Sequence, residues 1–120
     1  MKECIIKFIE DVKDSDYQVV QFHGDLDSNT LPLISYKIKE ILYKVTAPNL
    51  IFDFSDCTFI NSNGIGFLME IHMKLSRQHR VLVIAGAKAH IKDIFDLVGI
   101  PKIMSVFDTI GDAIHNIKKK

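Results

Sequence analysis

The chain has 120 residues, a length typical of one domain with a hydrophobic core of its own. Its hydrophobic content of 48% and charged content of 25% are ordinary for a globular protein and exclude a largely disordered chain. Its 15 basic and 15 acidic residues cancel, which argues against the basic surface of a nucleic-acid-binding protein or of one held on anionic lipid by charge.

The first half of the chain alternates strand and helix patterns. Residues 5–10 and 17–23 are rich in apolar and β-branched side chains around a polar turn, and they predict an antiparallel pair of strands that Gly24 ends. Apolar residues then recur at three- and four-residue intervals over 31–45, which predicts an amphipathic helix. A buried strand is predicted at 50–54.

The second half continues this alternation, with helices predicted from near Ile65 to 78, at 91–98 and at 110–117, and strands at 81–85 and 103–107. Gly99 is expected to stop the third helix, and Asp108 or Thr109 to cap the last one. The resulting order, ββαβαβαβα, predicts an α/β fold. We expect a mixed, mostly parallel sheet of about five strands covered by about four helices, with the first strand antiparallel at an edge.

Two cysteines and the absence of long apolar runs bear on the cellular setting. Cys4 and Cys57 form no recognisable metal or redox spacing, so free thiols in a reducing cytosol are the simpler interpretation, with a disulfide between them left open. The N-terminus leads into an amphipathic strand rather than a signal core, and no run approaches the ~18 apolar residues of a transmembrane helix. We expect a cytoplasmic protein.

Ser62 is the most conspicuous polar residue, because it stands between a buried strand and a long helical pattern. The plainest role for its hydroxyl is a helix cap, worth about 1 kcal/mol. A phosphate on Ser62 would meet free N–H groups and the positive end of the helix dipole, and would add about −1.5 to −2 charges. The two roles are compatible, and the residues alone favour the cap.

Asp25 and Asp27 also allow two interpretations. Either carboxylate can cap the first helix or stabilise the turn after the second strand. Alternatively, both form an acidic ledge beside Ser62, because loops at the carboxyl ends of parallel strands meet at one end of a sheet.

Patterns for catalysis and for metal or nucleotide binding are incomplete. A dinucleotide loop beginning at Gly64 would need a third glycine where the chain has Met69. A serine hydrolase would need an elbow glycine where the chain has Ile60, and the five histidines are scattered. We expect no catalytic residue, no metal and no cofactor.

Taken in order, these motifs resemble the STAS domain, and more narrowly the bacterial anti-sigma factor antagonists of the SpoIIAA type. The resemblance extends from about Ile5 to Ile117 and is carried by the segments 24–27, 52–55, 59–66, 81–85 and 94–100. It implies a single STAS domain over residues 1–120.

The resemblance further implies regulation by partner switching. In that family, a serine at the position of Ser62 is phosphorylated by a partner kinase that is also the anti-sigma factor, and a serine phosphatase reverses the modification. The unphosphorylated antagonist binds the kinase and releases the sigma factor. The docking surface is then expected to comprise Asp25, Asp27, Asn61, Ser62, Asn63, Gly64 and Ile65. The protein itself would be a monomer or weak dimer without nucleic-acid or membrane partners.

Two residues depart from the family pattern. Asn61 replaces the aspartate that usually precedes the serine, and Asn63 stands where serine or alanine is common. Loss of a carboxylate beside the acceptor removes a repulsion toward phosphate and bears on which kinase recognises the loop. The alternatives are an unswitched STAS scaffold or small-ligand sensor, which Asn61 favours, and a small α/β hydrolase that uses Ser62.

Overall fold

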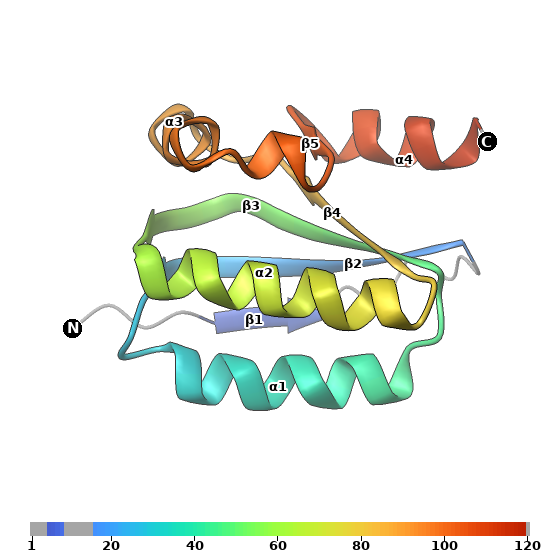
Figure 1. Cartoon of the computed structure of the whole chain (residues 1–120), viewed down its shortest axis with the longest axis horizontal. Coiled ribbons are helices and arrows are strands. Elements are labelled where there is room, and N and C mark those ends of the chain that lie inside the picture. Colours follow the sequence, from blue (N-terminus) through green and yellow to red (C-terminus); the bar gives the residue numbers. More distant parts are fainter. Residues whose placement is uncertain (1–4, 9–15, 120) are drawn as a thin grey trace.

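A computed structural model describes residues 5–8 and 16–119 (Figure 1). The elements, in chain order, are β1 (Ile5–Phe8), β2 (Tyr17–Leu26), α1 (Leu31–Lys44), β3 (Asn49–Ile60), α2 (Ser62–Arg77), β4 (Val81–Ala85), α3 (Ala89–Val98), a 3-10 turn (Ile100–Lys102), β5 (Val106–Phe107) and α4 (Ile110–Lys118). The end of the predicted first strand (9–10) and Cys4 lie outside the described residues.

The strands form one sheet in the order β1-β2-β3-β4-β5. At one edge β1 pairs antiparallel with β2, and every other pair is parallel. The predicted mixed, mostly parallel sheet with an antiparallel edge strand is therefore confirmed.

Helices cover both faces of this sheet. On one face, α1, α2 and α3 bury apolar side chains such as Ile38, Leu68 and Phe95 against the strands, and α1 lies beside α2 (Figure 1). On the other face, α4 packs Ala113 against β3 and β4. Because β4 is covered on both faces, its sequence is an unbroken apolar run, as predicted.

β2 and β3 are longer than the sequence predicts. β2 continues through Gly24 to Leu26, and β3 continues beyond Phe54 to Ile60. Gly24 has a φ of 93°, a conformation that favours glycine, and lies at a register shift between the two strands. The prediction that Gly24 ends the strand is wrong, because the chain bulges there and resumes pairing.

Three further boundaries test the predictions for the second half. The 3-10 turn leaves β5 only two residues long, Val106–Phe107, instead of the predicted five. Gly99 ends α3 with a φ of 81°, as predicted. Thr109, one of the two candidate caps of α4, accepts a hydrogen bond on Oγ1 from the backbone N of Asp112 at 3.0 Å.

The extensions of β2 and β3 determine where the loops lie. Leu26 pairs with Ile60, so the two parallel strands end side by side. The loop into α1 and the start of α2 consequently lie at the same end of the sheet. This is the end at which the sequence places its candidate site.

Candidate functional site

Asp25 is the first of the predicted site residues along the chain, and it lies within β2 rather than in a loop. Its Oδ1 accepts a 2.6 Å hydrogen bond from Thr58 Oγ1 on β3. The backbone O of Thr58 in turn accepts a 2.9 Å hydrogen bond from Nε2 of His90 at the start of α3. The half-buried Asp25 carboxylate is thus held at a fixed position beside the end of β3.

Asp27 stabilises the turn between β2 and α1. Its Oδ1 accepts hydrogen bonds from the backbone N of Asn29 at 2.9 Å and from that of Thr30 at 3.2 Å. Thr30 Oγ1 also accepts from the backbone N of Asp27 at 3.1 Å. Of the two roles that the sequence left open, Asp27 therefore stabilises the turn and does not cap α1. The N-cap of α1 is Thr30, whose side chain makes no capping hydrogen bond.

The cap of α2 is Asn61, not Ser62. Asn61 has extended backbone angles, and its Oδ1 accepts a 3.1 Å hydrogen bond from the backbone N of Gly64. Its backbone O accepts the first helical bond, from Ile65 at 3.0 Å. The interpretation of Ser62 as the helix cap is therefore wrong, and the helix begins three residues earlier than the predicted start at Ile65.

Ser62 occupies the first helical position, and its side chain is exposed. Its hydroxyl makes no hydrogen bond to any residue in 16–119. Helix geometry leaves the first N–H groups without internal acceptors, and Asn61 satisfies only that of Gly64. The N–H groups of Ser62 and Asn63 therefore remain available to an anion at the positive end of the helix dipole.

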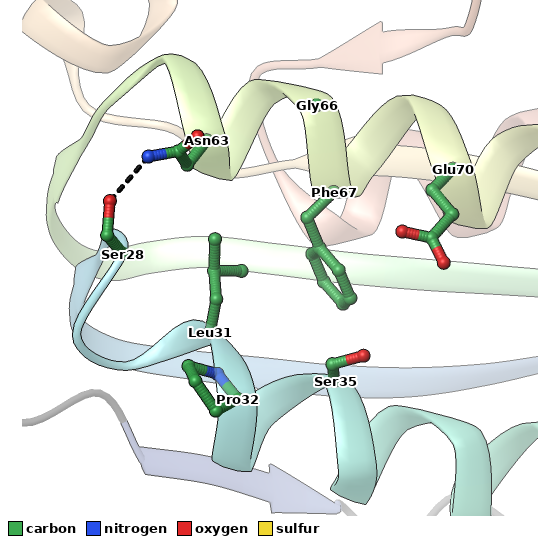
Figure 2. A pocket seen from close by; sticks show the side chains of 8 residues that line it. All are labelled: Ser28, Leu31, Pro32, Ser35, Asn63, Gly66, Phe67 and Glu70. Atoms are coloured by element: carbon green, nitrogen blue, oxygen red, sulfur yellow. Dashed lines mark hydrogen bonds between the residues drawn. The ribbon is translucent and has the colours of Figure 1, made fainter.

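Gly64 and Asn63 fix the start of α2 against the neighbouring loop. Gly64 is buried so closely that a Cβ there would lie 2.6 Å from the backbone O of Leu26. Asn63 Nδ2 donates a hydrogen bond to Ser28 Oγ in the loop between β2 and α1 (Figure 2). The helix start is thereby held by β2 and by the loop that follows it.

Two apolar residues close to Ser62 in the chain are partly accessible. Phe59, near the end of β3, is 46% exposed, and Ile65 is half-buried against the core. The carboxylates of Asp25 and Asp27 lie on the β2 side and are hydrogen-bonded as described. The structure thus brings all seven predicted site residues to one end of the sheet, with the Ser62 side chain exposed.

Sequence reasoning missed Thr58, Ser28 and His90. Thr58 and Ser28 bond directly to predicted site residues, and His90 bonds to Thr58. Thr58 lay in a segment interpreted as a loop, and His90 comes from a distant helix. Strand pairing brings Thr58 to Asp25, whereas Ser28 and His90 arrive through contacts of a loop and a distant helix, and the sequence carried no local signal for any of these contacts.

The thiol of Cys57 is buried and stays protonated at neutral pH. Burial raises the pKa of Cys57 to about 11, while a backbone hydrogen bond of Phe59 opposes this; the negative charge of Asp25 adds to the increase and Lys88 opposes it. Within residues 16–119, no three His, Cys, Asp or Glu side chains are grouped to hold a metal ion. None of the described helices is long and apolar enough to cross a membrane.

Comparison with known proteins identifies this fold. The family model of the STAS domain matches residues 7–113. An anti-sigma factor antagonist from Mycobacterium paratuberculosis is similar in structure, with 20% identity, a TM-score of 0.83, and 96% of this chain and 94% of that chain covered. The anti-sigma factor antagonist SpoIIAA in its unphosphorylated form matches with 16% identity, a TM-score of 0.68 and coverage of 96% and 97%. Bacillus SpoIIAA in the phosphorylated form matches with 18% identity, a TM-score of 0.67 and coverage of 95% and 98%. At identities of 20% or less, these structural similarities establish the fold alone.

Proposed function

The chain belongs to the STAS domain family, and we propose that it is an anti-sigma factor antagonist that acts by partner switching. Unphosphorylated, it binds an anti-sigma factor serine kinase in the cytoplasm through Asp25, Asp27 and residues 61–65. Phosphorylation of Ser62 by that kinase abolishes binding, and a serine phosphatase restores it. The partner supplies ATP and catalysis, so the protein is not itself an enzyme.

The observation that carries this proposal is the position of Ser62. Its hydroxyl is exposed, makes no hydrogen bond within residues 16–119, and leaves capping to Asn61. A kinase therefore reaches the hydroxyl without breaking a bond that holds the fold. The similar fold of SpoIIAA, known in unphosphorylated and phosphorylated forms, is in keeping with such a modification.

The surroundings of Ser62 explain why a phosphate would block docking. A phosphate adds about −1.5 to −2 charges at pH 7. Phe59 and Ile65 offer apolar surface at this end of the sheet, where Asp25 and Asp27 also lie. A partner that covers this surface would have to desolvate the phosphate, which opposes binding.

The hydrolase alternative lacks a base at Ser62. His90 lies at this end of the sheet, but its Nε2 bonds to the backbone O of Thr58. His23 bonds to Gln21 and Asp56. Among residues 16–119, no histidine hydrogen-bonds to the Ser62 hydroxyl. A nucleophilic serine needs such a base within hydrogen-bond reach, so we favour the acceptor role.

The test is phosphorylation by the anti-sigma factor kinases of the source organism. Each purified kinase is incubated with the protein and Mg-ATP, and intact mass is recorded. We expect a single-phosphate shift that Ser62→Ala abolishes and that Ser76→Ala, an exposed serine at the other end of α2, leaves unchanged. No shift with any kinase, or a shift that persists in Ser62→Ala, would contradict the assignment.

Binding measurements separate switching from unswitched docking. Ser62→Asp is expected to lower kinase affinity by about tenfold or more, about 1.4 kcal/mol, whereas Ser76→Asp changes it little. Equal affinities for Ser62→Asp and wild type would favour the unswitched STAS scaffold or sensor, for which the neutral Asn61 is the supporting observation.

A further inference from the structure

A groove runs between α1 and α2, directly beside the candidate docking surface (Figure 2). Its volume is about 450 Å³, and it is lined by Ser28, Leu31, Pro32, Ser35, Asn63, Gly66, Phe67 and Glu70. The hydrogen bond between Asn63 and Ser28 spans the groove at its end nearest Ser62. The groove and the docking surface therefore share Asn63.

Small residues keep the two helices from filling this space. Gly66 has no side chain, and a Cβ built there would meet no atom within 4 Å. On the α1 side, Ser35 is also small. The apolar walls come from Leu31 and Pro32 on α1 and Phe67 on α2. The result is a shallow, open groove whose floor and walls combine apolar side chains with small polar ones.

Glu70 is the one ionisable residue among those that line the groove. It follows Phe67 on the same side of α2, and its side chain points from α2 toward α1 (Figure 2). Within residues 16–119, Glu70 forms no ion pair. The groove therefore offers a carboxylate beside apolar side chains, and none of the residues that line it is a cation.

We propose that this groove receives the side chain of an arginine or lysine from the docking partner. The methylene stem would lie along Leu31, Pro32 and Phe67, and the cationic head would reach the Glu70 carboxylate. Arginine and lysine bury their stems on apolar surface while the charged end stays near water, which is the combination that this groove provides. Arginine is also among the residues that most often dominate interface energies.

The position of the groove fits the docking proposed for Ser62, on which this inference rests. Glu70 lies eight residues after Ser62 on α2, about 12 Å along the helix. A standard protein interface buries about 800 Å² on each partner, which is wide enough to include both residues. One partner can therefore cover the hydroxyl and enter the groove together.

The first test uses butylguanidinium as the probe and needs no partner protein. Backbone amide shifts of the ¹⁵N-labelled protein are followed during titration with butylguanidinium and, separately, with neutral butylurea. We expect butylguanidinium to shift the amides of Ser35, Gly66 and Phe67, and Glu70→Gln to reduce these shifts to those of butylurea. Glu40→Gln, an exposed carboxylate on α1 that does not line the groove, serves as the matched control. Absent shifts, or shifts unchanged in Glu70→Gln, would overturn the proposal.

The second test separates the groove from the switch, using the kinase identified by phosphorylation. Glu70→Lys is expected to weaken kinase binding about tenfold or more and Glu40→Lys less than twofold. If Glu70→Lys binds as wild type while Ser62→Asp binds weakly, the groove proposal fails and the proposed function stands. If no kinase binds the wild type, the proposed function fails, and the butylguanidinium titration still decides whether the groove accepts a basic side chain.

Discussion

Gly64 and Gly66 lie two positions apart on α2, and the structure implies opposite responses to alanine. A Cβ at Gly64 would lie 2.6 Å from the backbone O of Leu26 and 2.7 Å from Cγ1 of Ile60. The first distance is 0.8 Å short of the 3.4 Å at which ordinary contact begins. The Ile60 side chain can rotate, but the Leu26 carbonyl belongs to the sheet, so α2 would have to move away. A Cβ at Gly66 would meet nothing within 4 Å.

The magnitudes follow from two opposing effects. Replacing glycine by alanine in a helix gains about 0.5–1 kcal/mol, because the unfolded chain loses less freedom and the helix is favoured. Overpacking a close contact costs about 1–3 kcal/mol. Moving the start of α2 also weakens the cap bond from Gly64 to Asn61, worth about 1 kcal/mol. We therefore expect Gly64→Ala to lower the free energy of unfolding by about 1–3 kcal/mol and Gly66→Ala to raise it by about 0.5–1 kcal/mol.

Urea denaturation followed by far-ultraviolet circular dichroism measures both changes. At equal denaturant slope, the midpoint should fall for Gly64→Ala and rise for Gly66→Ala. Two results would refute the reasoning. A Gly64→Ala variant as stable as wild type would mean that α2 does not approach Leu26 so closely. A Gly66→Ala variant with a lower free energy of unfolding than wild type would mean that other atoms lie within contact distance of a Cβ at position 66.

Three other changes test the loops around Ser62 and the buried thiol of Cys57. Asn61→Ala should lower the free energy of unfolding by about 1 kcal/mol in urea denaturation, whereas Asn61→Asp, which keeps an acceptor oxygen at the helix start, should cost less than about 0.5 kcal/mol. Asp27→Ala should cost about 1–2 kcal/mol, because the N–H group of Asn29 loses its acceptor and that of Thr30 keeps only the backbone O of residue 27. Asp27→Asn should cost less, and a thermal melt that ranks the two variants otherwise contradicts the turn role. For Cys57, the raised pKa means that the unfolded thiol ionises first, so stability should fall as pH rises from about 9 to about 11. The difference in the free energy of unfolding between wild type and Cys57→Ala, measured by urea titration, should become smaller over this pH range. A difference that stays constant would contradict the raised pKa of Cys57.

The parts of the fold that the sequence predicts well are those whose signal is local. β4 coincides with the apolar run Val81–Ala85, because a strand buried on both faces needs no polar residue. α1 follows its apolar periodicity, with Ile34, Ile38 and Leu42 buried. Gly99 ends α3 because it alone there supplies the left-handed turn cheaply.

The errors arise where pairing with a distant strand overrides the local pattern. Polar residues after Phe54 indicate a loop, yet Asp56 and Cys57 pair with β2 across the bulge at Gly24. Glycine interrupts a regular strand, and the sequence does not show whether the neighbouring strand tolerates the interruption. The same long-range pairing brings Thr58 to Asp25, which explains why this contact could not be foreseen.

The cap of α2 was predicted wrongly for a different reason. The cap was placed at Ser62 because serine is a good N-cap, but asparagine is an equally good one. The backbone decides between them, because Asn61 is extended and Ser62 is already helical. The rule that the carboxyl ends of parallel strands meet at one end of a sheet was sufficient to place Asp25 and Ser62 there. It could not predict which hydrogen bonds these residues make.

The identity of the cap bears on how a switch at Ser62 would work. If Ser62 were the cap, phosphorylation would change a group that holds the helix, and loss of binding would be mixed with loss of local structure. With Asn61 as the cap, the hydroxyl makes no hydrogen bond within residues 16–119, and a phosphate would add charge at the helix start without breaking a bond that holds the fold. Asn61 also keeps the acceptor oxygen of the family's usual aspartate without its negative charge. A phosphate on Ser62 would then meet the free N–H groups of Ser62 and Asn63 with no carboxylate directly before it, which favours a stable phosphorylated form.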